Sequence, residues 1–129
     1  VDRIKIARRL NEMRPENLPP LNICIQVNTS REATKSGISI EKIEDFIDEI
    51  QDYKNLKIRG LMSLPKIKSN INEQRDSFMP LKKIFKKLRK NKPELDTLSI
   101  GTTQDMEAAI AEGATFVRIG TAIFGPRNI

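Results

Sequence analysis

The chain has 129 residues, of which 38% are hydrophobic and 31% are charged, and its formal net charge at pH 7 is +6. One cysteine and no histidine exclude Ser-His-Asp triads, Cys-His dyads, zinc sites built from histidine or several cysteines, and the usual general base at neutral pH. Any chemistry must therefore come from lysine, arginine, carboxylates, hydroxyls, backbone N–H groups or a bound cofactor.

The cysteine content and the hydropathy of the chain limit the cellular compartments that are expected for the protein. Cys24 lies in an apolar stretch and predicts a small buried residue, and a lone cysteine indicates the cytosol. No apolar run reaches the roughly 18 residues that a membrane-spanning helix needs, and no secretion signal is visible at the beginning of the chain. Val1 is not a start methionine, which leaves open that the natural N-terminus lies upstream.

Helical and strand-like patterns alternate along the whole chain. They predict, in order, a helix at 2–13, a strand at 21–28, a helix at 39–53, a strand at 56–64, a helix at 72–90, a strand at 97–100, a helix at 103–112, a strand at 114–119 and a short helical turn at 121–124. This alternation predicts parallel pairing with right-handed crossovers. Four strands are enough for half of a (β/α)₈ barrel and also for a small open sheet.

Particular residues mark the expected ends of these elements. Ser39 is a predicted N-cap, and Gly113 lies where a helix often ends with a left-handed residue. Pro80 falls within the predicted helix at 72–90, where it must either kink the helix or lie in its first turn.

The first candidate site is the turn that follows the third predicted strand. Gly101 allows a tight turn and a close approach of the backbone to a ligand. Thr102 and Asp105 have the spacing of a capping box, and the N–H groups of a first helical turn favour an anion. Ser99, Thr102 and Thr103 add hydroxyl groups. Taken alone, this turn is also explained as an ordinary helix cap.

The second candidate site follows the fourth predicted strand. Alternation puts Phe116, Arg118 and Gly120 on one face of that strand, so that Arg118 points into a barrel. A buried guanidinium needs a partner, which is either a ligand or a structural carboxylate. Gly120 and Thr121 again offer backbone N–H groups and a hydroxyl.

The two turns carry more information together than separately. In (β/α)₈ barrels a phosphate commonly rests on the loops after strands seven and eight and on a short extra helix. The last two predicted strands both end in glycine-and-hydroxyl turns, and the helical turn at 121–124 fits the extra helix. The sequence therefore predicts binding of a phosphorylated small molecule.

Several stretches resemble the pyridoxal phosphate homeostasis protein family, which is related to the N-terminal barrel of alanine racemase. The matching stretches are Lys35-Ser36-Gly37, Arg59-Gly60-Leu61-Met62, Leu98-Ser99-Ile100-Gly101, residues 105–110 and residues 117–125. The resemblance extends over nearly the whole chain and implies a TIM-type (β/α)₈ barrel that holds pyridoxal 5′-phosphate (PLP). It implies that residues 1–129 are the C-terminal half of this single domain, supplying strands five to eight and their helices, with the N-terminal half absent.

The same resemblance implies roles for individual residues. The phosphate would rest on Ser99, on the backbone at 101–103, and on Gly120 and Thr121. Arg118 would face the pyridine nitrogen and keep it unprotonated, with Met62 near the ring. The implied cofactor-binding set is Met62, Ser99, Gly101, Thr102, Thr103, Arg118, Gly120 and Thr121. The family usually has Met at the position of Thr102 and often Ser at that of Thr103, which leaves these two side-chain contacts open.

In this family the lysine that carries PLP lies at the end of the first barrel strand, which has no counterpart here. Lys35 is the nearest alternative by barrel geometry, and a solvent-exposed lysine is the competing interpretation. Half a barrel would also leave two open strand edges. We therefore expect the missing half, or a second copy of the chain, to be needed to cover them.

Three functions follow from these patterns. The first is a PLP-binding protein of intracellular PLP homeostasis that performs no catalysis and binds neither nucleic acid nor membrane. The second is a fragment of a PLP-dependent fold-type III racemase or decarboxylase. The third is nucleic-acid binding, which rests only on the basic run at 82–92. No aromatic residues interleave with that run, and a solvated outer helix explains it equally well.

Overall fold

A computed structural model describes residues 1–31, 33 and 36–128. In chain order its elements are α1 (Ile4–Met13), β1 (Leu21–Val27), the 3₁₀ turn η1 (Ile40–Lys42), α2 (Ile43–Ile50), β2 (Leu56–Ser63), α3 (Ile71–Arg89), β3 (Thr97–Ser99), α4 (Met106–Ala111) and α5 (Thr121–Phe124). The alternation of helices and strands agrees with the prediction. Of the helices in the described part of the chain, none has the length and hydropathy of a membrane-spanning segment.

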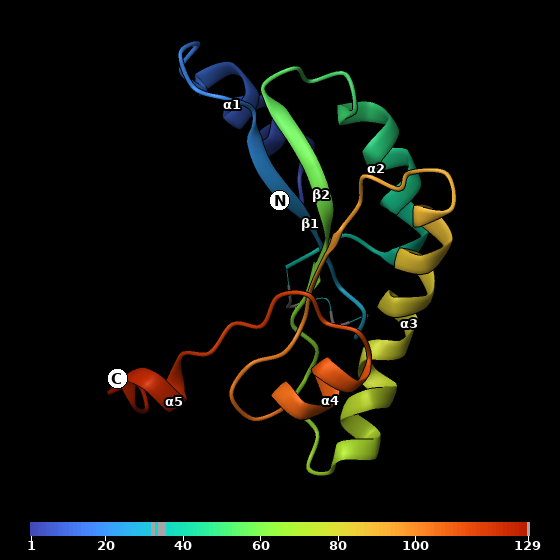
Figure 1. Cartoon of the computed structure of the whole chain (residues 1–129), viewed down its shortest axis with the longest axis vertical. Helices are drawn as coiled ribbons and strands as arrows, with labels where there is room; N and C mark the ends of the chain where they lie inside the picture. The colour runs from blue at the N-terminus through green and yellow to red at the C-terminus, as the bar shows by residue number, and fades with distance from the viewer. Residues whose placement is uncertain (32, 34–35, 129) are drawn as a thin grey trace.

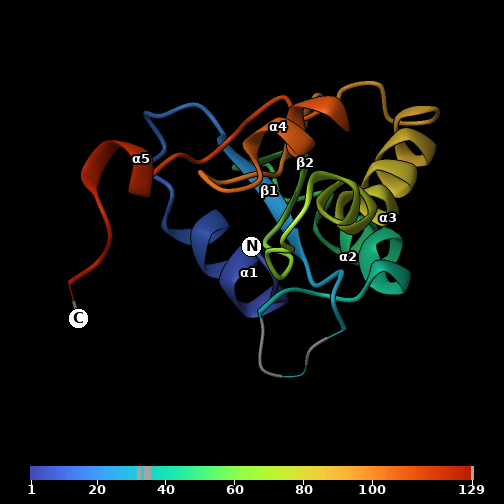
Figure 2. The same cartoon turned by 90° about the horizontal axis from the view of Figure 1, so that it is seen from below.

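The three strands form one parallel sheet in the order β1-β2-β3. Each connection between neighbouring strands contains a helix, because parallel strands cannot be joined by a tight turn. Figure 1 shows α2 and α3 along one side of the sheet, with α5 and the C-terminus standing away from the rest. In the view from below, the sheet lies between α3 and α5 (Figure 2). The predicted parallel α/β arrangement is therefore confirmed.

Alternation along β1 decides which face of the sheet is buried. Ile23, Ile25 and Val27 are buried under the helices, whereas Asn22 and Cys24 point to the other face. The helices contribute apolar side chains at spacings of three and four residues, as an amphipathic helix does. The main helix residues of this core are Ala7, Ile43, Phe46, Ile47, Ile50, Phe78, Leu81, Phe85 and Leu88. Each such side chain stabilises the fold by about 1.5–3 kcal/mol when buried, so this layer holds the unit together.

The opposite face of the sheet has a different composition. The strand register places Gln26, Met62, Ser99 and Phe116 in one row across the sheet. Phe116 is 57% exposed, which is unusual for a phenylalanine next to a parallel sheet. In a closed barrel this row would face the interior, where side chains from other strands would cover it.

A bulge in β2 brings that strand unusually close to β3. The register of β1 and β2 shifts between the pairs Ile23–Ile58 and Cys24–Gly60, so that Arg59 is the extra residue. A Cβ atom at Gly60 would lie 1.6 Å from the carbonyl oxygen of Thr97, a distance that no side chain tolerates. Gly60 is therefore required where the two backbones meet.

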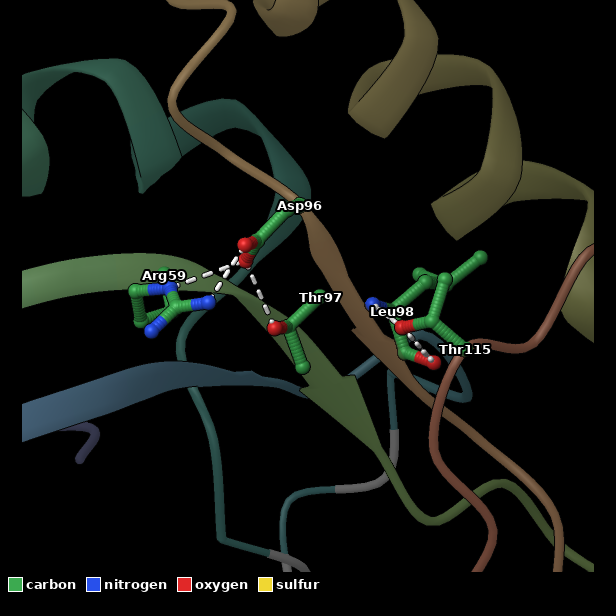
Figure 3. A network of polar contacts seen from close by, with 5 residues as sticks. All are labelled: Arg59, Asp96, Thr97, Leu98 and Thr115. Atoms are coloured by element: carbon green, nitrogen blue, oxygen red, sulfur yellow. Dashed lines mark hydrogen bonds and ion pairs between the residues drawn. The ribbon is translucent and has the colours of Figure 1, made fainter.

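The prediction of a fourth strand at 114–119 is wrong. This segment is extended but makes only an isolated parallel bridge between Ser99 and Phe116. The hydroxyl oxygen of Thr115 accepts the hydrogen bond of the Leu98 N–H at 2.7 Å, where a ladder would use a backbone carbonyl (Figure 3). The N–H groups of Thr115 and Phe116 both donate to the Leu98 carbonyl. A side chain thus replaces a backbone partner, and no described strand pairs with the far side of the segment.

The outer edge of β1 is partly occupied by residues that belong to no strand. The Val1 ammonium group donates to the Cys24 carbonyl at 2.9 Å, and the Gln26 N–H donates to the Val1 carbonyl at 2.9 Å. These two bonds have the pattern of a parallel bridge opposite Ile25. Ile38 forms a further parallel bridge with Val27. The same alternation directs the Asn22 backbone to this edge, where the described residues offer no partner strand.

Two helix boundaries differ from the prediction. Ser39 precedes η1 and makes no side-chain cap, and α2 ends at Ile50 rather than at residue 53. The predicted N-cap is therefore wrong in its hydrogen bonding. The start of α3 is set by Asn70, whose side chain accepts a hydrogen bond from the Glu73 N–H at 2.9 Å. Pro80 lies inside α3, which continues through it, so the first-turn alternative is wrong.

Candidate functional site

The two predicted turns lie next to each other at the carboxyl end of β3. The Arg118 N–H donates to the Gly101 carbonyl at 2.9 Å, and the Ala122 N–H donates to the Thr103 hydroxyl oxygen at 3.2 Å. The turn after β3 and the start of α5 are therefore joined directly. The expected convergence of the two turns is present in the structure.

Gly101 fits its turn for two separate reasons. Its φ is +99°, in the region that side chains rarely adopt, and a Cβ atom there would lie 2.5 Å from the Cβ of Ala109. The prediction that this position needs glycine agrees with both facts. The glycine also lets the first turn of the site pack closely on α4.

The capping box at this turn is formed only in part. The Asp105 carboxylate accepts a hydrogen bond from the Thr102 N–H at 2.7 Å and from the Thr102 hydroxyl at 3.2 Å. The reciprocal bond from the Asp105 backbone is not made, and α4 begins at Met106 rather than at residue 103. The carboxylate holds residues 102–105 in a turn that delays the helix. Gly113, with φ of +94°, follows the end of α4 as predicted.

Several backbone donors remain unused at these turns. Among the described residues, no acceptor is found for the N–H groups of Thr103, Gln104, Gly120 or Thr121. A Cβ atom at Gly120 would meet nothing within 4 Å, so there is open space on this side of the second turn. Unpaired N–H groups beside open space are suited to an anionic group.

Arg118 points from the second segment across the end of β3. Its Nε donates to the Ser99 hydroxyl oxygen at 3.1 Å, and its Nη2 donates to the Ser63 carbonyl at 2.9 Å. Burial lowers the pKa of this guanidinium, and the nearby charge of Asp105 acts in the opposite direction. In the part of the chain that the structure describes, no carboxylate forms an ion pair with Arg118, and its side-chain partners are the Ser99 hydroxyl and the carbonyls of Ser63 and Ser99.

An apolar hollow of about 370 Å³ lies beside Arg118, on the face of the sheet opposite the one that the helices bury. Its lining residues are Asn22, Ile23, Cys24, Arg59, Met62, Thr97, Ser99, Phe116 and Arg118. Met62, Ser99 and Arg118 are thus brought together here, whereas the other predicted cofactor-binding residues, Gly101, Thr102, Thr103, Gly120 and Thr121, do not line this hollow. Cys24 is only partly buried, contrary to the prediction, and this partial burial raises the pKa of its thiol. Phe116 was not predicted as a site residue, although its alternation with Arg118 places both on one face.

The far end of the hollow is closed by a polar network. Arg59 binds Asp96 through Nε, at 2.9 Å, and through Nη2, and the Thr97 hydroxyl donates to the same carboxylate at 2.9 Å (Figure 3). The hydrogen bonds from Arg59 and Thr97 lower the pKa of Asp96 to about 2. Sequence reasoning did not find this network, because the bulge that aims Arg59 at Asp96 leaves no local signal.

The basic run on α3 makes structural contacts. Lys82 pairs with the buried Glu112 of α4 at 3.1 Å, and Lys87 pairs with Glu44 of α2 at 3.2 Å. These contacts agree with the outer-helix interpretation. The described residues contain no group of acidic, cysteine or histidine side chains suited to a metal ion. Lys35 lies outside the described residues, so its suggested role has no structural account.

Comparison with known proteins gives a family and several relatives. The family profile "Alanine racemase, N-terminal domain" matches residues 1–128. The pyridoxal phosphate homeostasis protein of Pseudomonas aeruginosa is 48% identical over 128 residues, which cover 99% of this chain and 54% of the relative. The Escherichia coli protein of the same name is 45% identical, with 55% of its length covered. The chain spans about half the length of the curated relatives it matches.

Solved structures agree with this assignment. PipY of Synechococcus elongatus, solved with PLP bound, matches with a TM-score of 0.82 at 28% identity, covering 97% of this chain and 58% of that one. A Bifidobacterium adolescentis protein matches with a TM-score of 0.85 at 30% identity, covering 96% of this chain and 51% of that one. A lysine/ornithine decarboxylase of Vibrio vulnificus, 18% identical, shares the fold alone, with a TM-score of 0.62. Because the profile matches nearly the whole chain, the chain belongs to the alanine racemase N-terminal domain family.

Proposed function

We propose that this chain binds PLP at the carboxyl end of its sheet and contributes to intracellular PLP homeostasis without catalysing a reaction. The observation that carries the proposal is the convergence of two turns with unused N–H groups beside the Arg118 guanidinium. Support also comes from relatives that are named pyridoxal phosphate homeostasis proteins and from PipY, which was solved with PLP bound. The lone cysteine is in keeping with a cytosolic setting for this role.

The residues of the two turns fit a phosphate group. The N–H groups of Thr103, Gln104, Gly120 and Thr121 supply donors, and the open space at Gly120 leaves room for phosphate oxygens. In the proposal, the backbone N–H groups of Thr103, Gly120 and Thr121 hold the phosphate, with the hydroxyls of Thr103 and Thr121 beside it. The N–H and hydroxyl of Thr102 already donate to Asp105, and the Ser99 hydroxyl oxygen accepts from Arg118, so these expected phosphate contacts are used within the protein. Charge-assisted hydrogen bonds of this kind are stronger than neutral ones, which favours a dianion over water.

Arg118 and Met62 fit the ring end of the same ligand. When bound, PLP supplies an aldehyde and a pyridine ring that withdraws electrons best when its nitrogen is protonated. A guanidinium donates hydrogen bonds but does not give up its proton at neutral pH. Arg118 would therefore hold the pyridine nitrogen unprotonated, which suits storage of PLP rather than chemistry on it. Met62 and Ser99 line the hollow from the neighbouring strands.

We further propose that residues 1–129 supply the C-terminal half of a (β/α)₈ barrel, with β1, β2 and β3 as three of its strands and the extended segment 114–119 in the place of the last. The support is threefold: the open edge of β1, the bare row at Met62 and Phe116, and the exposure of Ile123 and Phe124 on α5, which are 68% and 85% accessible. Each of these features leaves apolar side chains or strand backbone uncovered. The other half of a barrel, or a second copy of the chain, would cover them. Light scattering tests this point, since a monodisperse monomer with a cooperative melt contradicts it.

On the proposal that the chain is the C-terminal half, the lysine that carries PLP in the family would lie outside residues 1–129, and Lys35 is the proposed substitute within them. Reduction of the PLP complex with borohydride, followed by peptide mapping, tests this assignment. We expect the label on Lys35. A label on any other lysine removes Lys35 from the proposal but leaves the phosphate site standing.

Gly120→Asp is the sharpest test of the PLP site. The added carboxylate would repel the phosphate, while the open space around Gly120 lets the fold persist. We expect PLP binding to weaken by about tenfold or more, as for loss of a charge-assisted contact. Asn17→Asp, which makes the same change of charge on an exposed loop, should bind PLP as the unsubstituted chain does.

Two outcomes would contradict the proposal. One is equal binding of PLP by the Gly120→Asp and Asn17→Asp variants. The other is a measurable rate of amino-acid racemisation or decarboxylation by the PLP-loaded protein, which would favour the enzyme alternative. Binding of nucleic acid that falls steeply with salt and ignores PLP would instead favour a polyanion-binding role.

A further inference from the structure

Ser99 has a polar contact that its place in the proposed PLP site does not require. It is 5% exposed and lies at the end of β3, with its hydroxyl oxygen 3.1 Å from Nε of Arg118. The contact joins two elements that share only one backbone bridge, between Ser99 and Phe116. Arg118 lies on a segment that is only loosely paired with the sheet. A buried serine that accepts a hydrogen bond from its guanidinium can therefore fix the direction in which the side chain points.

The Arg118 guanidinium is held along one edge. Nε donates to the Ser99 hydroxyl, Nη2 donates to the Ser63 carbonyl at 2.9 Å, and a longer contact of 3.4 Å joins Nη2 to the Ser99 carbonyl. Among the described residues Nη1 has no acceptor. Because the guanidinium is planar, fixing the Nε–Nη2 edge also fixes the direction in which Nη1 points.

Only one of these three contacts depends on a side chain. The carbonyl groups of Ser63 and Ser99 would be present with any residue at those positions. The Ser99 hydroxyl is thus the only acceptor that evolution or mutagenesis can remove without moving the backbone. It is also uncharged, so it orients Arg118 without neutralising it, whereas a carboxylate at this position would do both.

We propose that Ser99 is the positioning residue that aims the free Nη1 end of Arg118 at the ring of the ligand. The inference rests on the proposed PLP site for the identity of the ligand, but not for the Ser99–Arg118 contact itself. Arg118 touches the ligand, and Ser99 acts through Arg118. Met62, Ser99 and Phe116 line the same hollow as Arg118.

Ser99→Ala and Ser99→Thr are the informative pair of variants. Alanine removes the acceptor from Nε, and threonine restores a hydroxyl at nearly the same place. The first measurement uses the protein without ligand: the solvent exchange rate of the Arg118 Nε–H proton by ¹H–¹⁵N NMR, with Arg118→Lys identifying the signal. We expect exchange to be about tenfold or more faster in Ser99→Ala and close to the original rate in Ser99→Thr.

The second measurement uses PLP labelled with ¹⁵N at the pyridine nitrogen. We expect its chemical shift in the complex to move toward that of free PLP in Ser99→Ala and to return in Ser99→Thr. Unchanged Nε–H exchange in a Ser99→Ala variant whose amide spectrum is otherwise native overturns the inference. If PLP fails to bind the unsubstituted chain, the proposed function fails, while the exchange experiment still decides the role of Ser99.

Discussion

Thr103 accepts a hydrogen bond from the Ala122 N–H at 3.2 Å, and among the hydrogen bonds of the described residues this one joins α5 to the turn after β3. The residues of α5 are exposed along its whole length. Together with the bond from the Arg118 N–H to the Gly101 carbonyl at 2.9 Å, this contact holds the two halves of the proposed phosphate site side by side. The first prediction follows from it.

Thr103→Val keeps the shape of the side chain and removes its hydroxyl. We expect hydrogen exchange of the Ala122 amide to accelerate and PLP affinity to fall about threefold to tenfold, the range for loss of one modest hydrogen bond. Amide exchange by NMR and an equilibrium titration with PLP measure the two effects. Ser77→Ala removes a hydroxyl that bonds only within α3 and should change neither quantity. Unaltered Ala122 exchange in Thr103→Val would show that the contact does not hold α5.

Gly101→Ala should destabilise the fold more than Gly113→Ala. Both residues have positive φ, of +99° and +94°, but a Cβ atom at Gly101 would lie 2.5 Å from that of Ala109, whereas one at Gly113 meets nothing within 4 Å. We expect a loss of about 2–4 kcal/mol at Gly101 and about 1 kcal/mol at Gly113, measured by urea unfolding. Combining Gly101→Ala with Ala109→Gly should recover part of the difference. Equal losses at the two glycines would mean that the contact with α4 relaxes freely.

Glu112, which directly follows α4 as its C-cap, is expected to be more sensitive to substitution than Glu107 within the helix. It is 3% exposed and accepts from Arg75 at 2.7 Å and from Lys82 at 3.1 Å, which ties α4 to α3. Glu112→Gln should cost about 1–3 kcal/mol, toward the lower end because Arg75 is half exposed. Glu107→Gln on the exposed side of the same helix should change stability by about 0.5 kcal/mol or less. Urea unfolding of both variants at neutral pH compares them directly, and equal effects would contradict the prediction.

Asp96 should contribute a pH-dependent part of the stability. Its pKa is lowered from 3.8 to about 2, first by the hydrogen bond from Arg59 and then by that from Thr97. A carboxyl group with a lowered pKa in the fold stabilises above its unfolded pKa, and this contribution is lost as the pH falls through its folded pKa. The stability difference between the original chain and Asp96→Asn should therefore be constant above about pH 5 and shrink as the pH falls toward 2. The midpoints of urea unfolding of both proteins, measured across this pH range, test the prediction. A stability difference that is as large at pH 2 as at neutral pH contradicts it.

Much of the fold could be predicted because local patterns agree with the tertiary structure. The pattern at 21–28 identified the strand β1, and Gly113 identified the end of α4, because each depends on residues close in sequence. The parallel arrangement followed from the order of elements alone. In the candidate site, the proximity of the turns at Gly101 and Gly120 was expected for the same reason.

The features that could not be predicted depend on contacts between distant segments. The segment 114–119 has a strand-like pattern, but its pairing is changed by the Thr115 hydroxyl, which takes the Leu98 N–H. The pairing of Arg59 with Asp96 depends on the β2 bulge, and bulges leave no reliable signature in a single sequence. The contacts of Ser63 and Ser99 with Arg118 depend on the arrangement of three segments that are distant in sequence: the end of β2, the end of β3 and the segment 114–119.

The segment that carries Arg118 has a second consequence. It is bridged to β3 on one side only, so its other side is available to whatever polypeptide completes the sheet there. Any such partner would restrict the same backbone that positions the guanidinium. Occupancy of the site and completion of the fold would then be thermodynamically linked, and each would be favoured by the other to the same extent.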